Sequence, residues 1–135
     1  MDDIVREMEE YVTSGWARTK SAPLHVIVVA NDHNEIIGVT HPNDFDDDLR
    51  AFVRERSRAT NARAVALVAE AWMEREGSGV IEEILMLAIE TRTTRILRVW
   101  KIGPERSITR FMPAEMLHSF DGRMTGLMDP GLRAN

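Results

Sequence analysis

Cysteine is absent from this 135-residue chain. A disulfide framework, a thiolate zinc site, an iron–sulfur cluster and a cysteine nucleophile are therefore all excluded. Long apolar runs are absent too. Apolar runs such as Val26–Ala30 are far short of the ~20 residues that a membrane-spanning helix needs. The chain opens with Met1-Asp2-Asp3, which is acidic where a signal peptide begins with positive charge. We therefore expect a cytoplasmic protein with no membrane partner.

Recognisable catalytic motifs are also missing. No serine lies in a G-x-S-x-G elbow, and Gly77-Ser78-Gly79 is not followed by the G-K-[ST] of a phosphate-binding loop. No spaced metal-ligand signature such as H-E-x-x-H is present. The sequence therefore identifies no reaction and predicts no cofactor, which favours a non-enzymatic protein.

Charge is unevenly spread along the chain. The 17 basic and 22 acidic residues give a net charge of −5. Residues 1–48 carry 3 basic and 11 acidic side chains, whereas residues 92–135 carry 8 basic and 4 acidic ones. A negative total argues against a nucleic-acid partner, because contacts with phosphate supply most non-specific affinity. One basic stretch keeps that alternative open: Arg92, Arg95, Arg98, Lys101, Arg106 and Arg110.

The chain has the length and composition of one globular domain. Hydrophobic residues make up 44% of it, which is enough for a packed core, and 135 residues favour a single unit. We expect one domain over residues 1–121. Residues 122–135 are rich in glycine, methionine and proline without a clear period, so they are interpreted as a C-terminal tail.

Hydrophobic periodicity predicts an alternation of helices and strands. Residues 2–14 carry an apolar stripe typical of a helix, and Gly15 is a plausible end. A second helix is expected over 44–60, capped by Asn43 or Asp44. Alternating and β-branched runs predict strands at 24–31, 35–41, 64–73, 83–91 and 94–102, with a short extra strand near 108–112 and a short helix over 113–120.

This order predicts an α+β fold. A hairpin, a crossover helix and a three-strand meander would form one five-stranded, mostly antiparallel sheet with the two main helices on one face. The weakest element is 64–73, whose alanines would also fit a helix. The order is similar to that of roadblock-type and other small scaffold domains, a resemblance at the level of the fold that does not determine function.

The second half of the chain resembles a family of small uncharacterised bacterial and phage proteins. The resemblance rests on 66–73, on 82–86 with 88–90, and on the closing segment 122–128. It covers about half of the chain. The Ser/Pro/Arg-containing stretch that this family has between the two strands is replaced here by Glu74–Ile81. The resemblance implies no activity, and it supports only the strand assignments.

Histidines and carboxylates gather around the first hairpin. Imidazole with carboxylate is a ligand set for zinc, iron or manganese, and the candidates are His25, His41 and Asp44. A two-residue turn would place His25 and His41 on opposite faces of the sheet, whereas a three-residue loop would set them opposite each other. The alternative function is therefore a small metal-assisted hydrolase at this hairpin, although solvated turn residues are the favoured interpretation.

Two glutamates on expected strands have a chemical and a structural interpretation. Glu70 lies beside Trp72 on one strand face, where an indole could raise the carboxyl pKa for acid–base chemistry. The favoured alternative is a solvent-facing residue or an ion pair with Arg98. Glu90 and Arg95 flank the expected 92–93 turn and should form a cross-strand ion pair.

Large apolar groups indicate an interaction surface. If both helices cover the Leu67 face of the sheet, Trp72 and Val68 remain on the open face, and an exposed apolar patch usually marks an interface. The C-terminal segment adds Met112, Met116 and Phe120. The sequence therefore predicts a non-enzymatic interaction or scaffold domain that forms a homodimer. An unidentified protein is the other partner class.

Overall fold

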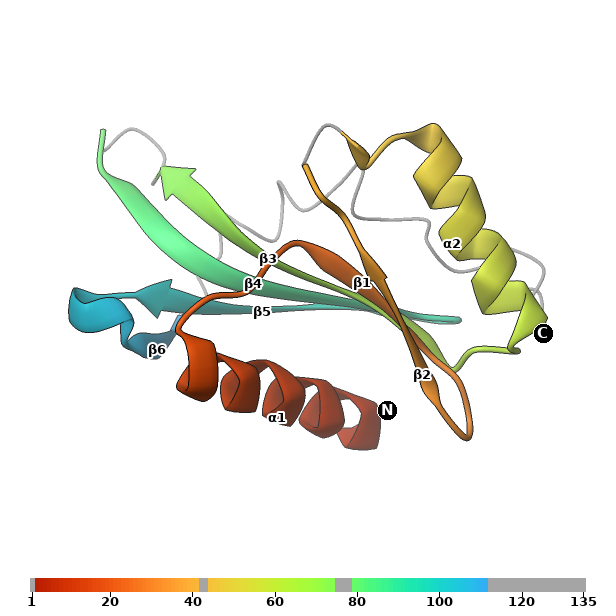
Figure 1. Cartoon of the computed structure of the whole chain (residues 1–135). Coiled ribbons are helices and arrows are strands. Elements are labelled where there is room, and N and C mark those ends of the chain that lie inside the picture. The colour runs from red at the N-terminus through yellow and green to blue at the C-terminus, as the bar shows by residue number, and fades with distance from the viewer. Residues whose placement is uncertain (1, 42–43, 75–78, 112–135) are drawn as a thin grey trace.

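The structure of the chain is a computed structural model, and it describes residues 2–41, 44–74 and 79–111 (Figure 1). Helix α1 spans Asp2–Thr19 and α2 spans Asp47–Ala59. The strands are β1 His25–Val29, β2 Asn34–Gly38, β3 Ala64–Glu74, β4 Ile81–Thr91, β5 Arg95–Ile102 and β6 Ile108–Phe111, with a short 3-10 helix η2 at Pro104–Arg106. The helix expected over 113–120 and the tail 122–135 lie outside the described residues.

The six strands of the described residues form one antiparallel sheet in the order β2-β1-β3-β4-β5-β6. The predicted α+β class is confirmed, as are the hairpin, the crossover helix and the meander. The sheet has six strands instead of five because the short extra strand expected near 108–112 pairs with β5. Residues 64–73 are a strand, as predicted: all of them pair with β4, and 64–68 also pair with β1.

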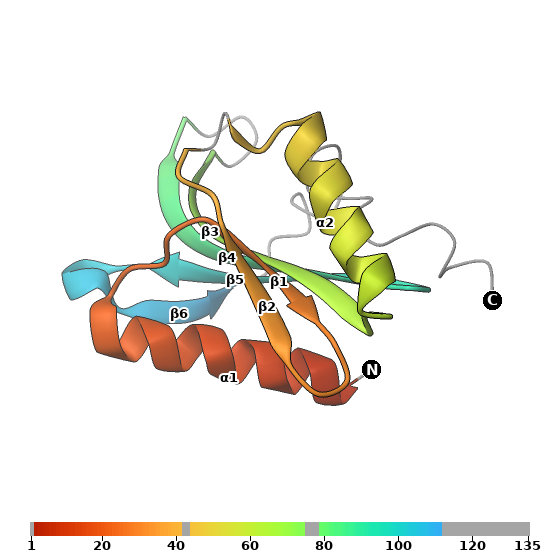
Figure 2. The same ribbon diagram turned by 45° about the vertical axis from the view of Figure 1, so that its right-hand side comes forward.

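The two helices lie on opposite faces of the sheet, contrary to the expectation that both cover one face (Figure 2). Because each β-strand points alternate side chains to opposite faces, the continuous apolar runs of β1, β3 and β4 fill two cores. A sheet that is apolar on both faces needs a cover on each. Neither helix in the described part of the chain is long and apolar enough to cross a membrane.

Helix α1 packs on one face, called here the α1 face. Its apolar stripe is buried against Ile27, Val68 and Leu87 of the sheet. The helix continues past Gly15, which the sequence suggested as its end, because Trp16 is buried and its indole Nε1 donates a 2.6 Å hydrogen bond to the carbonyl oxygen of Arg106. That contact fixes an additional turn.

Helix α2 packs on the other face, called here the α2 face. Val53 is fully buried against Val28 and Val65. The helix begins later than predicted: Asp46, not Asn43 or Asp44, is the N-cap, and its carboxylate accepts a hydrogen bond from the backbone N–H of Leu49. An acidic side chain in this position satisfies a free N–H and favours the helix dipole.

The first hairpin has a register that neither expected turn provides. His25 lies opposite Gly38, and Val29 lies opposite Asn34, which leaves a four-residue loop over 30–33. A hydrogen bond from the N–H of Ala30 to the carbonyl of His33 closes this loop at 3.0 Å. The pairing of His25 with His41 is therefore wrong.

Strands β3 and β4 extend beyond the rest of the sheet. Strand β1 pairs with β3 only over Ala64–Val68, so residues Ala69–Glu74 of β3 pair with β4 alone. Figure 1 shows both strands continuing past the end of β1, away from α2. We call residues 69–74 and 79–83 the arm.

Candidate functional site

Arg106 joins the base of the arm to the end of α1. Its Nη1 donates to Glu83 at 2.8 Å, its Nη2 pairs with Glu70, and its Nε donates to the carbonyl of Lys20 at 2.8 Å. Its guanidinium also lies over the Trp16 ring, 5.0 Å from the centroid. Hydrogen bonds to the two carboxylates raise the pKa of Arg106, with Glu70 the larger cause. Arg106 therefore stays charged and is held by three segments: the end of α1, β3 and β4.

Glu70 is part of this network and is not a free acid–base group. One carboxylate oxygen pairs with Arg106 and the other accepts the backbone N–H of Ala22 at 2.8 Å. The sequence favoured a solvent-facing Glu70 or an ion pair with Arg98; the structure shows an ion pair, but with Arg106. Arg98 instead donates to Glu9 of α1 at 3.0 Å. Both arginines tie α1 to the sheet.

The arm carries a cluster of exposed apolar side chains. Trp72 is 71% exposed, Ile81 63% and Val80 51%. Trp72 lies opposite Glu83 and Ile81 lies opposite Glu74, so Trp72 and Ile81 are diagonal neighbours on the α1 face. The charged side chains of Glu83 and Arg106 border them. This is an apolar patch with a polar rim of both signs.

Val68 and Trp72 have different environments although both point to the α1 face. Val68 is buried beneath α1, so its expected place on an open surface is wrong. Trp72 lies four residues further along β3, on the arm, and it is exposed as expected. The other interface candidates, Met112, Met116 and Phe120, lie outside the described residues.

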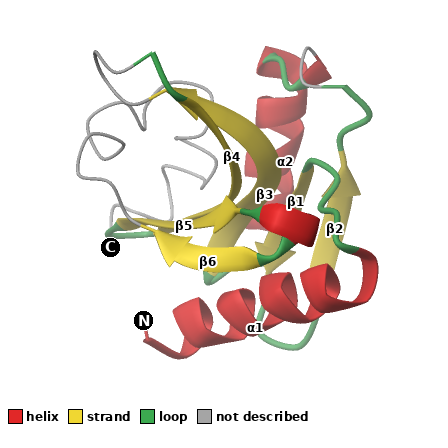
Figure 3. Ribbon diagram, turned by 90° about the vertical axis from the view of Figure 1, so that its left-hand side faces the viewer, coloured by secondary structure: helices red, strands yellow, loops and turns green. Residues whose placement is uncertain are grey.

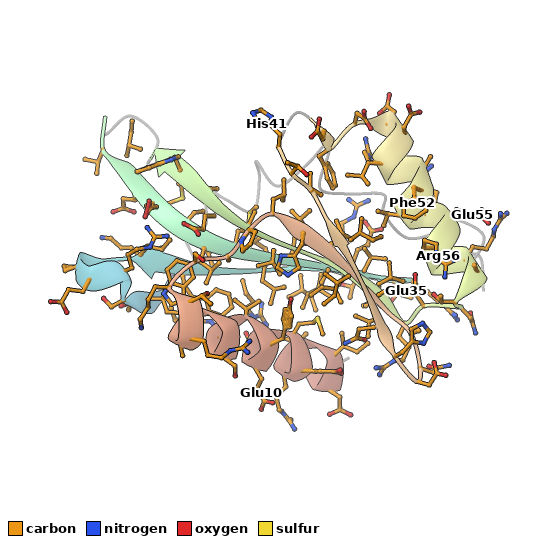
Figure 4. The ribbon with its side chains drawn as sticks, viewed as in Figure 1. Glu10, Glu35, His41, Phe52, Glu55 and Arg56 are labelled. Carbon is orange, nitrogen blue, oxygen red and sulfur yellow. The ribbon has the colours of Figure 1, made fainter. Side chains whose placement is uncertain are left out.

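The remaining exposed large apolar groups in the described ranges are isolated. Ile36 lies on edge strand β2 and Phe52 lies on α2. Figure 4 shows Phe52 on the helix, beside Glu55 and Arg56. Single exposed apolar side chains are common on protein surfaces, so these two carry no argument by themselves.

A shallow groove of about 360 Å³ lies between α1, the 21–23 segment and β2. At its floor the His25 Nδ1 contacts the carbonyl oxygen of Pro23 at 2.6 Å, so this nitrogen carries the proton in the neutral ring. The His25 Nε2 then accepts a 2.8 Å hydrogen bond from the Tyr11 hydroxyl. Burial raises the pKa of Tyr11 above 10.0, against the opposing charge of Arg18. The Tyr11 hydroxyl and the His25 Nε2 therefore bind each other, and the Tyr11 phenol keeps its proton.

The metal candidates are not gathered into a site. Both ring nitrogens of His25 are engaged, and Figure 4 shows His41 at the end of the loop after β2, pointing away from the sheet. Among the described residues, no three histidine or carboxylate side chains lie close enough to hold a metal ion. Asp44 is exposed next to that loop. These contacts give the hydrolase alternative no support.

A second ion-pair cluster ties the first hairpin to α2. Arg56 donates to both oxygens of Glu35, at 2.8 and 2.6 Å, and Figure 4 shows the two side chains facing each other. His33 contacts Asp32 at 2.7 Å and Glu35 at 3.3 Å. Arg56 first and His33 second lower the pKa of Glu35 from 4.5 to about 2. Hydrogen bonds to Asp32 and then Glu35 raise the pKa of His33 above 6.5.

The expected cross-strand pair at the β4–β5 turn is confirmed. Glu90 lies opposite Arg95, and the Arg95 Nε is 3.4 Å from a Glu90 carboxylate oxygen. The position of the two-residue turn was sufficient to predict this pair, because the turn fixes which residues lie opposite each other.

Comparison of the chain with protein-family models, with curated proteins and with solved structures found no match.

Proposed function

We propose that this protein is a non-enzymatic interaction domain that forms a homodimer through its arm. The observation that supports this most is the exposure of Trp72, Ile81 and Val80 together at the end of the β3–β4 hairpin where the two strands connect. Tryptophan is enriched among the residues that dominate binding energy, and such residues are typically surrounded by a polar rim. Glu83 and Arg106 provide that rim here.

A second copy is the occupant that the arm fits best. Residues Ala69–Glu74 have no strand partner other than β4 in the described part of the chain. Their sequence, Ala-Glu-Ala-Trp-Met-Glu, contains no proline or lysine, the residues that usually protect an exposed strand edge. Antiparallel pairing of an edge with itself is self-complementary, as a two-fold symmetric contact requires.

The charges of the arm favour one register of this pairing. A two-fold axis at Ala71 places Trp72 of one copy opposite Glu70 of the other. Since Glu70 is already paired with Arg106, this register brings an indole beside an arginine and a neutralised carboxylate. An axis at Trp72 would instead oppose Glu70 and Glu74, and like charges directly opposite are destabilising.

Sedimentation equilibrium of the full chain at micromolar concentration tests this proposal. We expect a mass near twice 15.3 kDa. The Trp72→Ser variant should raise the dimer Kd about 30-fold, because loss of such an anchor costs about 2 kcal/mol or more. A monomer mass for the unaltered chain would overturn the proposal.

Ile81→Ser and Ile36→Ser form a matched pair. The two isoleucines are 63% and 61% exposed, and each lies at a strand without a full set of neighbours. Only Ile81 belongs to the arm, so only Ile81→Ser should weaken the dimer. Equal weakening by both variants would show a general effect of surface hydrophobicity and would contradict the assigned surface.

A further inference from the structure

The apolar surface on the α2 face is wider than α2. On this face β4 contributes Ile84 and Met86, and β5 contributes Leu97 and Val99. All four are buried: their exposures are 1%, 3%, 4% and 0% respectively. Burial as complete as this requires a cover over both strands.

Helix α2 provides that cover only in part. It lies against β1, and Figure 3 shows it over the side of the sheet that holds β1 and β2. A helix with its side chains is roughly 10–12 Å wide. Adjacent strands are ~4.8 Å apart, so β4 and β5 lie roughly 10 and 14 Å from β1. Within the described ranges, no other helix or strand lies on the α2 face, and the loop before α2 adds only Val39 and Phe45 to this core.

The chain leaves the sheet beside this surface. Strand β6 is antiparallel to β5, and its last residue, Phe111, lies opposite Val99. Residues 112–135 follow directly, so no long connection is needed to reach the α2 face of β5 and β4.

The sequence of 112–135 suits such a cover. Met112, Met116 and Phe120 are spaced by four residues, the pattern of one apolar helix stripe. Met124, Leu127 and Met128 add further apolar groups. Methionine adapts well to irregular apolar surfaces because its side chain is unbranched and flexible.

We propose that residues 112–135 fold back on their own chain and cover the α2 face of β4 and β5, with Met112, Met116 and Phe120 directed at Ile84, Met86, Leu97 and Val99. This contact completes the core beside α2. It goes beyond the proposed dimer, since Trp72 and Ile81 of the arm lie on the opposite face.

Paramagnetic labelling tests where the segment lies. Because the chain has no cysteine, Ser119→Cys provides a single attachment point for a nitroxide on the full-length protein. We expect strong loss of the methyl signals of Ile84 and Val99. The methyls of Ile27 and Val29, which point to the α1 face, should keep their signals. Unchanged signals at Ile84 and Val99 would overturn the proposal.

A mixed sample distinguishes a cover from the same chain and a cover from a second copy. Isotope-labelled protein without the nitroxide is mixed with unlabelled protein that carries it. The proposal expects no signal loss at Ile84 or Val99 in this mixture. Loss there would show that a second copy supplies the segment, which would overturn the intrachain contact while leaving the arm proposal to its own test.

A pair of matched substitutions provides an independent readout. Phe120→Ser should accelerate amide hydrogen exchange in β5 and increase the fluorescence of a dye that binds exposed apolar surface. Phe52→Ser removes the same side chain from an exposed position on α2 and should change neither. Retained protection in α1 would show that both variants fold. The same exchange in β5 for Phe120→Ser as for the unaltered chain would contradict the proposal.

Discussion

Trp16 and Arg106, ninety residues apart, hold each other through two different contacts. The Trp16 indole N–H donates to the Arg106 carbonyl at 2.6 Å, and the Arg106 guanidinium lies over the same indole at 5.0 Å. The second contact leaves the guanidinium donors free to bind Glu70, Glu83 and the Lys20 carbonyl. This pair connects the end of α1 to the base of the arm.

The Trp16→Phe substitution should lower the free energy of unfolding by about 2 kcal/mol. It removes the indole donor and leaves the Arg106 carbonyl without its partner, a loss that typically costs about 1–3 kcal/mol. Urea unfolding at a concentration where the chain is monomeric provides the measurement. Trp72→Phe is the matched control: Trp72 is exposed, so we expect a change within about 0.5 kcal/mol. Equal losses would show that the Trp16 hydrogen bond contributes nothing specific.

The Glu105→Gly substitution should stabilise the protein by about 0.5–1 kcal/mol. Glu105 has left-handed backbone angles, φ 57° and ψ 25°, which are unfavourable for a residue with a Cβ atom. Glycine adopts these angles without strain. The strain relieved in the folded state exceeds the extra backbone entropy that glycine loses on folding. Glu105→Ala removes the same carboxylate but keeps the Cβ atom, so it should not stabilise. Thermal unfolding of the two variants compares them directly, and a lower melting temperature for Glu105→Gly would contradict the expectation.

The Val68→Ala substitution should cost about 2 kcal/mol in unfolding free energy. Val68 is buried beneath α1, and removal of its methyl groups loses both transfer energy and packing. Ile36→Ala removes a larger group from an exposed position and should stay within about 0.5 kcal/mol. Chemical denaturation checks both values. A negligible cost for Val68→Ala would contradict the burial of Val68 beneath α1.

The pairing of Glu35 with Arg56 predicts a pH-dependent contribution to stability. Because the pKa of Glu35 is lowered from 4.5 to about 2 in the folded chain, the unfolded chain binds the proton first as the pH falls. The contribution is therefore complete above 4.5 and is lost as the pH falls toward 2. Melting temperatures measured between pH 2 and pH 7 should show this decline, and Glu35→Gln should remove that part of it. Glu55→Gln on α2, where Glu55 pairs with Arg58, is the matched control and should retain the decline.

Local pattern was sufficient for the elements and for contacts between near neighbours. The β-branched content of 64–73 outweighed its alanines because a strand at that position buries side chains on both faces. Glu90 and Arg95 were paired correctly because a two-residue turn fixes which residues oppose each other. Trp72 is exposed as expected, although the expectation assumed an open sheet face, whereas α1 covers that face over Val68.

Contacts between distant segments were not available from the sequence. The alternation of β3 placed Val68 and Trp72 on the same face, but only the length of α1 and its position over the sheet decide that Val68 is covered and Trp72 is not. The sequence suggested Arg98 as the ion-pair partner of Glu70, because it lies on a neighbouring strand. The 3-10 turn at 104–106 instead brings Arg106 to the base of the arm, and Arg106 forms the pair.

The sequence by itself determined that this chain forms an antiparallel α+β domain, because period-two and period-3.6 patterns act over a few residues. Only the tertiary structure decided that the two helices lie on opposite faces. Both sides of β1, β3 and β4 are apolar, so periodicity assigns no preferred side to either helix. That choice depends on how each helix, each connection and each long-range ion pair fits the whole sheet at once.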